Sequence, residues 1–99
     1  MAPAALNEAE IIERLEQVPG WTREGDTITR TYKLDSYLAG LALASAVGTI
    51  AEGFDHHPDI VIGWRKVRVT FTTHSAGGKL THKDFDAAEA INALPYPRD

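Results

Sequence analysis

The spacing of hydrophobic and polar residues divides the chain into helices and strands. Three segments repeat apolar residues every three or four positions, as amphipathic helices do, and four show the alternation or short apolar run of β-strands. The predicted helices cover about residues 8–17, 36–54 and 81–94. The predicted strands cover residues 21–23, 27–34, 60–62 and 66–74. This order, α-β-β-α-β-β-α, favours an α+β fold in which three helices pack on one face of a four-stranded antiparallel sheet.

The second predicted helix is apolar around most of its circumference. One stripe contains Leu43, Val47, Ile50 and Phe54. Leu38, Leu41 and several alanines cover much of the rest. Such a helix is usually buried on more than one side, but a chain of 99 residues has little depth in which to bury it. A well-packed central helix would explain the pattern. We favour a helix that also lies near a subunit interface, and expect a homo-oligomer.

Composition and charge narrow the class of protein. The 99 residues, 1–99, are expected to form one domain, near the common size for a single hydrophobic core. The net charge of -4 and the absence of a basic run give no electrostatic support for direct nucleic-acid binding. The chain has no cysteine, which excludes disulfides and thiolate sites. The longest charge-free run, residues 36–51, is shorter than the roughly 18 apolar residues of a membrane span, so we expect a soluble, cytoplasmic protein.

The candidate chemistry begins with two adjacent histidines, His56 and His57, which are followed by Pro58. Proline stops a helix and restricts the residue before it to an extended conformation. Both imidazoles should therefore lie at the junction between the second helix and the third strand. His74 lies at the end of the fourth predicted strand. Since the start of one strand and the end of the next are neighbours in an antiparallel hairpin, the pairing should bring His74 close to the other two.

Three interpretations of this histidine group remain open. Imidazole titrates near neutral pH and both donates and accepts protons, which suits acid–base catalysis. The three histidines with Glu52 or Asp84 could instead bind zinc, although the chain has no standard metal spacing such as H-x-x-x-H. The convergence could also be a solvated junction without function. We favour acid–base catalysis without a metal.

Two acidic residues could accompany the histidines. Glu52 precedes His56 by one helical turn, so an i,i+4 contact between them is available. A solvated helix end would explain Glu52 as well. Asp84 could face the site from the last helix, but its spacing from Thr81 also suits a helix cap.

Polar and aromatic residues near the histidines could contact a ligand. Thr72, Thr73 and Ser75 flank His74 and could form hydrogen bonds with a polar ring. Trp64 could stack against a flat ligand, although a tryptophan next to a turn more often belongs to the core.

These residues together resemble the signature of a known family. The run contains Glu52-x-x-x-His56-His57-Pro58, Trp64, Thr72-Thr73-His74-x-Ala-Gly-Gly and Leu80-Thr81-x-x-Asp84. It resembles the signature of the pterin-4a-carbinolamine dehydratases, and the likeness extends over nearly the whole chain. One departure is Lys79, which stands between the paired glycines and Leu80 where the family usually has no residue. The longer loop affects the expected position of Asp84 more than that of the histidines.

The resemblance implies a fold, a reaction and an assembly. The family has a four-stranded antiparallel sheet with helices on one side, and its members form dimers or tetramers. They dehydrate 4a-hydroxytetrahydrobiopterin to quinonoid dihydrobiopterin, which recycles the cofactor of aromatic amino-acid hydroxylases, without a metal or organic cofactor. Some proteins of this fold are instead non-enzymatic partners in transcription or in RuBisCO assembly. A complete histidine set favours the enzyme, and a protein-binding module is the alternative.

The resemblance also implies which residues act. The functional histidines correspond to His56, His57 and His74, and the motif aspartate corresponds to Asp84. The segments that contact the pterin correspond to Asp55-His56-His57 and Thr72-Thr73-His74-Ser75. Dehydration needs one proton delivered to the leaving hydroxyl and one removed from N5 of the pterin, and imidazoles can do both. The hypothesis is that His56 and His74 act as acid and base while His57 mainly holds the pterin.

Overall fold

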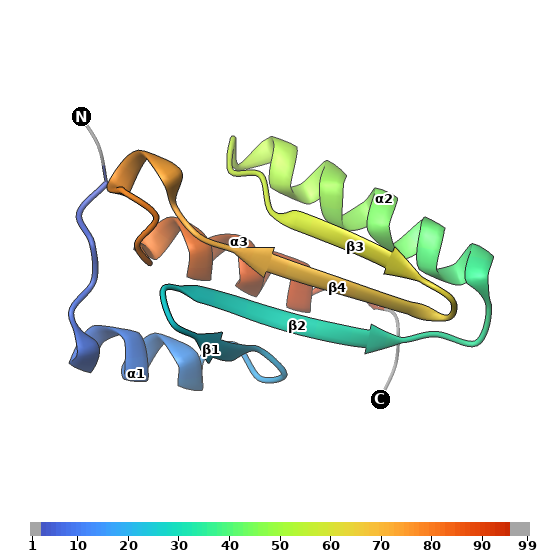
Figure 1. Ribbon diagram of the computed structural model, residues 1–99, viewed down its shortest axis with the longest axis horizontal. Helices are drawn as coiled ribbons and strands as arrows, with labels where there is room; N and C mark the ends of the chain where they lie inside the picture. Colours follow the sequence, from blue (N-terminus) through green and yellow to red (C-terminus); the bar gives the residue numbers. More distant parts are fainter. Residues whose placement is uncertain (1–2, 96–99) are drawn as a thin grey trace.

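The computed structural model describes residues 3–95, and it contains the predicted order of helices and strands (Figure 1). The elements are α1 (Glu8–Glu16), β1 (Thr22–Glu24), β2 (Thr27–Lys33), α2 (Tyr37–Gly53), β3 (Asp59–Gly63), β4 (Lys66–Phe71), a 3₁₀ turn η1 (His74–Ala76) and α3 (His82–Asn92). The strands form one antiparallel sheet in the order β1-β2-β4-β3. The α+β fold class and the element order are therefore confirmed.

One strand is shorter than predicted. β4 ends at Phe71 and not at His74, because His74 begins the turn η1. The alternation itself is confirmed, since Val67, Val69 and Phe71 are all fully buried. The error arose because side chains continue to alternate through Thr73 after the regular ladder with β2 has ended.

Side-chain caps determine where the helices begin. Asn7 and Glu10 form a capping box at α1, with both hydrogen bonds 2.9 Å long. The Ser36 hydroxyl accepts the amide of Ala39 at the start of α2. A second capping box joins Thr81 to Asp84 at α3. Each cap satisfies backbone N–H groups that the first helical turn leaves without partners.

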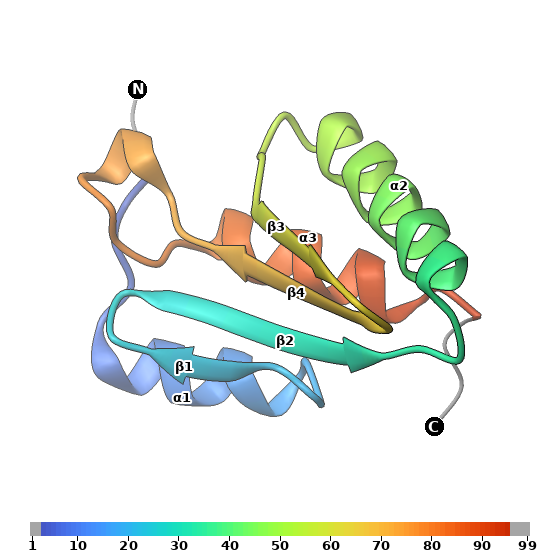
Figure 2. The same ribbon diagram turned by 45° about the vertical axis from the view of Figure 1, so that its right-hand side comes forward.

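The strand register places the histidine segments at one end of the sheet. β3 pairs with β4 from Asp59 opposite Thr70 to Gly63 opposite Lys66. The start of β3 and the end of β4 are therefore neighbours, as Figure 2 shows. The loop that leaves α2 and the loop that leaves β4 both emerge there.

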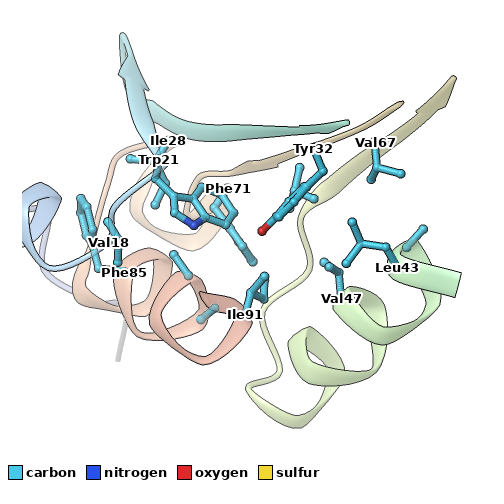
Figure 3. Close-up of a cluster of buried hydrophobic side chains, with 14 of the residues drawn as sticks. Val18, Trp21, Ile28, Tyr32, Leu43, Val47, Val67, Phe71, Phe85 and Ile91 are labelled. Carbon is cyan, nitrogen blue, oxygen red and sulfur yellow. The ribbon is translucent and has the colours of Figure 1, made fainter. Parts of the chain in front are cut away.

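The hydrophobic core lies between the sheet and the helices, as Figure 3 shows. The labelled side chains come from the inner face of the sheet and from α2, α3 and the segment after α1: Val18, Trp21, Ile28, Tyr32, Leu43, Val47, Val67, Phe71, Phe85 and Ile91. Within residues 3–95, no helix has both the length and the apolar character needed to cross a membrane.

One surface of α2 and the edge strand β3 keeps large apolar side chains exposed. Leu38 is 73% exposed at the start of α2, beside Tyr37 and Leu41. On β3, Ile62 is 40% exposed and lies on the same face of the sheet as buried Val67. Val61 is also exposed, but it points to the opposite face. We call Tyr37, Leu38, Leu41 and Ile62 the α2/β3 surface. Because these side chains are not covered by the rest of the described chain, they are accessible for the subunit interface that the sequence predicts.

Candidate active site

The loop between α2 and β3 turns His56 inward. α2 ends at Gly53, and Asp55 then adopts a left-handed conformation with φ of 51°. Few residues other than glycine adopt this conformation, and aspartate is one that tolerates it. The amide of His56 bonds back to the carbonyl of Ala51 at 3.1 Å, which closes the end of the helix. His56 is consequently buried, with 7% of its surface exposed, while His57 beside it is exposed.

His56 is held on two sides. Its ring lies nearly parallel to that of Phe71, with centroids 5.5 Å apart and an interplanar angle of 9°. Its Nε2 lies 2.6 Å from Oδ1 of Asp84. Phe71 belongs to the buried face of β4, and Asp84 belongs to the first turn of α3. The imidazole therefore has a fixed plane and a fixed partner.

Asp84 is fully buried and its carboxylate is saturated with donors. Oδ2 accepts the Thr73 hydroxyl at 2.8 Å and the Thr81 amide at 2.9 Å. Oδ1 accepts from His56. A buried carboxylate is stable only when it is hydrogen-bonded in this way. The cap predicted from the spacing of Thr81 and Asp84 is confirmed, and the same carboxylate also contacts His56.

The bond to Asp84 assigns the tautomer of His56. An ionised carboxylate only accepts hydrogen bonds, so the ring hydrogen must be on Nε2. Neutral His56 then has an unprotonated Nδ1. Within residues 3–95, the one buried side-chain nitrogen or oxygen without a hydrogen-bond partner is Nε of Arg14. Nδ1 of His56 also has no hydrogen-bond partner among the described residues, so its absence from the buried groups means that it is not sealed from the surface.

Glu52 pairs with His57, and the i,i+4 contact that its spacing made available to His56 does not form. Nε2 of His57 lies 3.0 Å from Oε2 of Glu52. The i,i+4 geometry fails because the helix ends at Gly53, before His56 is reached. The side chains of His57 and Glu52 are 61% and 70% exposed, so water screens the pair. His57 is therefore held only loosely.

His74 lies at the same end of the sheet, on the surface. It follows Thr73, whose hydroxyl bonds to the carboxylate that holds His56. Its side chain is exposed and forms no hydrogen bond or ion pair with any other residue in the range 3–95. The topology thus brings the three histidines to one end of the fold, with one buried and two exposed.

Lys79 is tied into the loop before α3, and Asp84 contacts His56 with this loop in place. The carbonyl of Lys79 accepts the amide of Thr73 at 3.0 Å, and its ammonium group bonds to Asp26 at 3.1 Å. Gly77 and Gly78 have φ of 74° and 76°, which allows the loop to turn back sharply. The longer loop is closed by these bonds, and the cap of α3 positions Asp84 independently.

The predicted ligand-contacting residues occupy different environments. Asp55 and Ser75 are exposed near the histidines. The Thr72 hydroxyl donates to the carbonyl of Asp26 in the β1–β2 turn, at 2.8 Å. Thr73 is only 1% exposed, and its hydroxyl is engaged with Asp84. The structure therefore favours a structural role for the Thr73 side chain over contact with a ligand.

Trp64 lies at the other end of the hairpin. It follows β3 directly, so about five residues, or roughly 17 Å of strand, separate it from the histidine end of this chain. It is 76% exposed, so it does not belong to the core either.

An open pocket of about 310 Å³ lies at this hairpin tip. Its lining residues are Lys33, Leu34, Trp64, Arg65 and Lys66. This pocket contains none of the histidines.

The sequence interpretation missed two contributors to the site. One is Phe71, a buried residue of β4 whose ring stacks on His56. The Thr81 hydroxyl, which lies 2.8 Å from the Thr73 hydroxyl, was recognised only as a cap. The β3–β4 register, continued past Asp59 and Thr70, would have indicated that Phe71 lies close to the histidine loop.

The described part of the chain has no group of three His, Asp or Glu side chains arranged to hold a metal ion. The pair His56–Asp84 and the pair His57–Glu52 are separate. The arrangement is one buried imidazole–carboxylate pair beside two exposed imidazoles.

Comparisons with known proteins show a similarity that extends over most of the chain. Residues 4–94 match the family described as pterin 4 alpha carbinolamine dehydratase. A Roseiflexus castenholzii protein provisionally named pterin-4-alpha-carbinolamine dehydratase is 50% identical over 91 residues, which cover 92% of this chain and 97% of that protein. A Natronomonas pharaonis protein with the same provisional name is 52% identical over 79 residues, which cover 79% of this chain and 85% of that protein. The crystal structure of a transcriptional coactivator/pterin dehydratase from Brucella melitensis is similar with a TM-score of 0.82 and 31% identity, covering 90% of this chain and 96% of that one.

Proposed function

Because the chain belongs to the pterin 4 alpha carbinolamine dehydratase family, we propose that it dehydrates 4a-hydroxytetrahydrobiopterin to quinonoid dihydrobiopterin. The physiological role would be recycling of the tetrahydropterin cofactor. The observation that carries the proposal is the buried His56–Asp84 pair, which lies at the same end of the sheet as exposed His57 and His74. Three histidines of this kind suit a reaction that moves two protons at neutral pH.

The proposed reaction has a base and an acid. Removal of the N5 proton leaves an electron pair that forms the C4a=N5 double bond. The C4a–O bond breaks, its electron pair leaves with the oxygen, and a second proton converts the hydroxyl to water. We assign the base to His56, because a carboxylate behind an imidazole stabilises the imidazolium that forms when the ring accepts a proton. We assign the acid to His74, which is exposed and has no protein partner within residues 3–95. His57 would hold the pterin.

Single replacement of each histidine by alanine tests this assignment. General acid–base catalysis contributes about 10²–10⁴ in rate, so His56→Ala and His74→Ala should each lower kcat by at least about tenfold. His57→Ala should raise KM more than it lowers kcat. The assay uses a synthetic 4a-hydroxytetrahydropterin, with the uncatalysed rate subtracted and folding checked by circular dichroism. Full activity in all three variants would overturn the assignment.

We also propose that the chain forms a homodimer or homotetramer through the α2/β3 surface. Four large apolar side chains are exposed there, and β3 is an edge strand with unpaired backbone groups. Leu38→Glu should shift the mass measured by light scattering toward the monomer, whereas Thr31→Glu, on the helix-free face of the sheet, should not. An unchanged mass for Leu38→Glu would contradict this interface.

A protein-binding role is the alternative for the same surface. The Brucella melitensis relative carries the name of a transcriptional coactivator as well as that of a dehydratase. If the chain is monomeric in solution and Leu38→Glu leaves its kcat unchanged, the α2/β3 surface would be available for a different protein. A dehydratase activity that requires the three histidines would remain compatible with that role.

A further inference from the structure

We propose that Thr73 and Thr81 are positioning residues for the reaction, because their hydroxyls form a one-directional hydrogen-bond relay that fixes Asp84 and, through it, the tautomer of His56. This inference rests on the proposed function, since it concerns the same site. Both threonines are 1% exposed, so neither can contact a ligand from its side chain. Their effect on the reaction must pass through the carboxylate.

The direction of every hydrogen in the relay follows from the donors available. A carboxylate only accepts, so the single hydrogen of the Thr73 hydroxyl goes to Oδ2 of Asp84, 2.8 Å away. The Thr73 oxygen must then be the acceptor in its 2.8 Å contact with the Thr81 hydroxyl. The Thr81 hydroxyl therefore donates to Thr73, while its oxygen accepts the backbone amide of Lys83 at 3.2 Å. No alternative orientation satisfies all of these contacts.

The relay is distinct from the helix cap that it adjoins. The capping box of α3 needs the Thr81 oxygen and the bond from the Thr81 amide to Asp84. Neither of these bonds involves Thr73. Thr73 comes from the segment after β4, and its hydroxyl is the only side-chain donor on Oδ2 among the described residues. A change at Thr73 can therefore alter the carboxylate while the cap of α3 remains.

The relay determines which carboxylate oxygen is left for His56. Two donors occupy Oδ2, which leaves Oδ1 directed at the imidazole at 2.6 Å. Without the Thr73 hydroxyl, Oδ2 would keep only the backbone amide, and the carboxylate would be less restrained. A less restrained carboxylate can turn away from Nε2, and the ring of His56 would then populate both tautomers. Only one of them has the unprotonated Nδ1 that we propose as the base.

Thr73→Val and Thr73→Ser separate positioning from packing. Valine has the shape of threonine without the hydroxyl, whereas serine keeps the hydroxyl without the methyl group. The matched control is Thr29→Val, which removes a buried hydroxyl that donates to the carbonyl of Val69 at 3.1 Å. Thr29 points to the face of the sheet opposite to Phe71 and the stacked His56 ring. Thr29→Val should lower stability in a similar way and leave kcat unchanged.

Two measurements test the relay. Thr73→Val should lower kcat by about tenfold. This is the lower end of the losses caused by removing a partner behind a functional histidine. KM should stay within about twofold of the native value. Long-range ¹H–¹⁵N spectra should show the His56 ring moving from the tautomer with hydrogen on Nε2 to a mixture. Thr73→Ser should restore both. If Thr73→Val does not fold, Thr73→Ala is compared with Thr73→Ser by the same measurements.

The outcomes also separate this inference from the proposed function. Wild-type kcat in Thr73→Val, or a Thr73→Ser variant as impaired as Thr73→Val, would overturn the relay. A wild-type protein without dehydratase activity would overturn the proposed reaction instead. In that case the nuclear magnetic resonance measurement would still decide the relay, because it needs no substrate: an unchanged tautomer of His56 in Thr73→Val would overturn it.

Discussion

Replacing Asp84 by asparagine tests whether the negative charge, and not only the shape of the side chain, orients His56. The oxygen of asparagine can still accept the Thr81 amide, so the cap of α3 should survive. The NH₂ group would then face Nε2 of His56, where Oδ1 accepts a hydrogen in the native protein. Two donors cannot bond to each other, so the imidazole must switch its hydrogen to Nδ1.

This switch should affect catalysis much more than stability. It places a hydrogen on the nitrogen that we propose as the base, and the analogous Asp→Asn change behind a triad histidine lowers kcat about 10⁴-fold. Here the imidazole has a smaller catalytic task, so we expect kcat to fall about 10²- to 10³-fold. Because the bonds to Oδ2 are kept, the free energy of unfolding should change by no more than about 1 kcal/mol.

Asp84→Ala provides the contrast. It leaves three donors, the Thr73 hydroxyl, the Thr81 amide and Nε2 of His56, without their acceptor in a fully buried position. At about 1–3 kcal/mol for each unsatisfied donor, and with some rearrangement, the free energy of unfolding should fall by roughly 3–5 kcal/mol. A loss of that size is a large part of the ~5–15 kcal/mol typical of a domain.

The assay combines initial dehydration rates, corrected for the uncatalysed reaction, with urea unfolding of each variant. The Asp84→Asn and Asp84→Ala variants should be similar in activity and very different in stability. Native kcat in a folded Asp84→Asn variant would refute the reasoning, because it would show that the reaction does not depend on which nitrogen of the imidazole carries the hydrogen.

Three further predictions concern residues around the site and the fold. Phe71→Leu should lower the free energy of unfolding in urea by about 1–2 kcal/mol. It should also lower kcat a few-fold, because the stacked imidazole loses its planar support, and an unchanged kcat would show that stacking is dispensable. Glu52→Gln should leave kcat within about twofold, because its pair with His57 is exposed, and a tenfold loss would contradict that view. Hydrogen bonds from Arg23 hold the pKa of Glu8 below its ordinary value, so the pair stabilises the fold above that value and the effect is lost as the pH falls through the lowered pKa. Glu8→Gln should therefore reduce the melting temperature at neutral pH and not in strong acid; equal reductions at both would contradict the assignment.

The fold was predictable because the pattern and the local signals agreed with one another. The two-residue alternation of β4 and the apolar stripes of the helices indicated which faces are buried. The spacing of Asp84 from Thr81 indicated the cap at the start of the last helix. The end of β4 was not predictable in this way. Thr73 is still buried and still alternates, but its backbone bonds to Lys79 in the following loop and not to β2.

The candidate site was predictable to the level of residue clusters and not to the level of bonds. Strand pairing was enough to bring the segments of His56, His57 and His74 together. It could not show which histidine is buried, since that depends on the left-handed conformation of Asp55 after α2. The same turn transfers the Glu52 contact from His56 to His57. Helical spacing predicts contacts only as far as the helix continues.

The double role of Asp84 links the site to the folding of the last helix. Its Oδ2 accepts the Thr81 amide that begins α3, and its Oδ1 accepts from His56 in the loop after α2. The capped helix therefore holds the imidazole in place, and loss of the cap would also release His56. His57 and His74 lie on exposed loops and lack such a link, so they can adjust to a ligand. In the proposed reaction, His56 would therefore be a preorganised proton acceptor, and exposed His57 and His74 would leave room for the substrate to enter and leave.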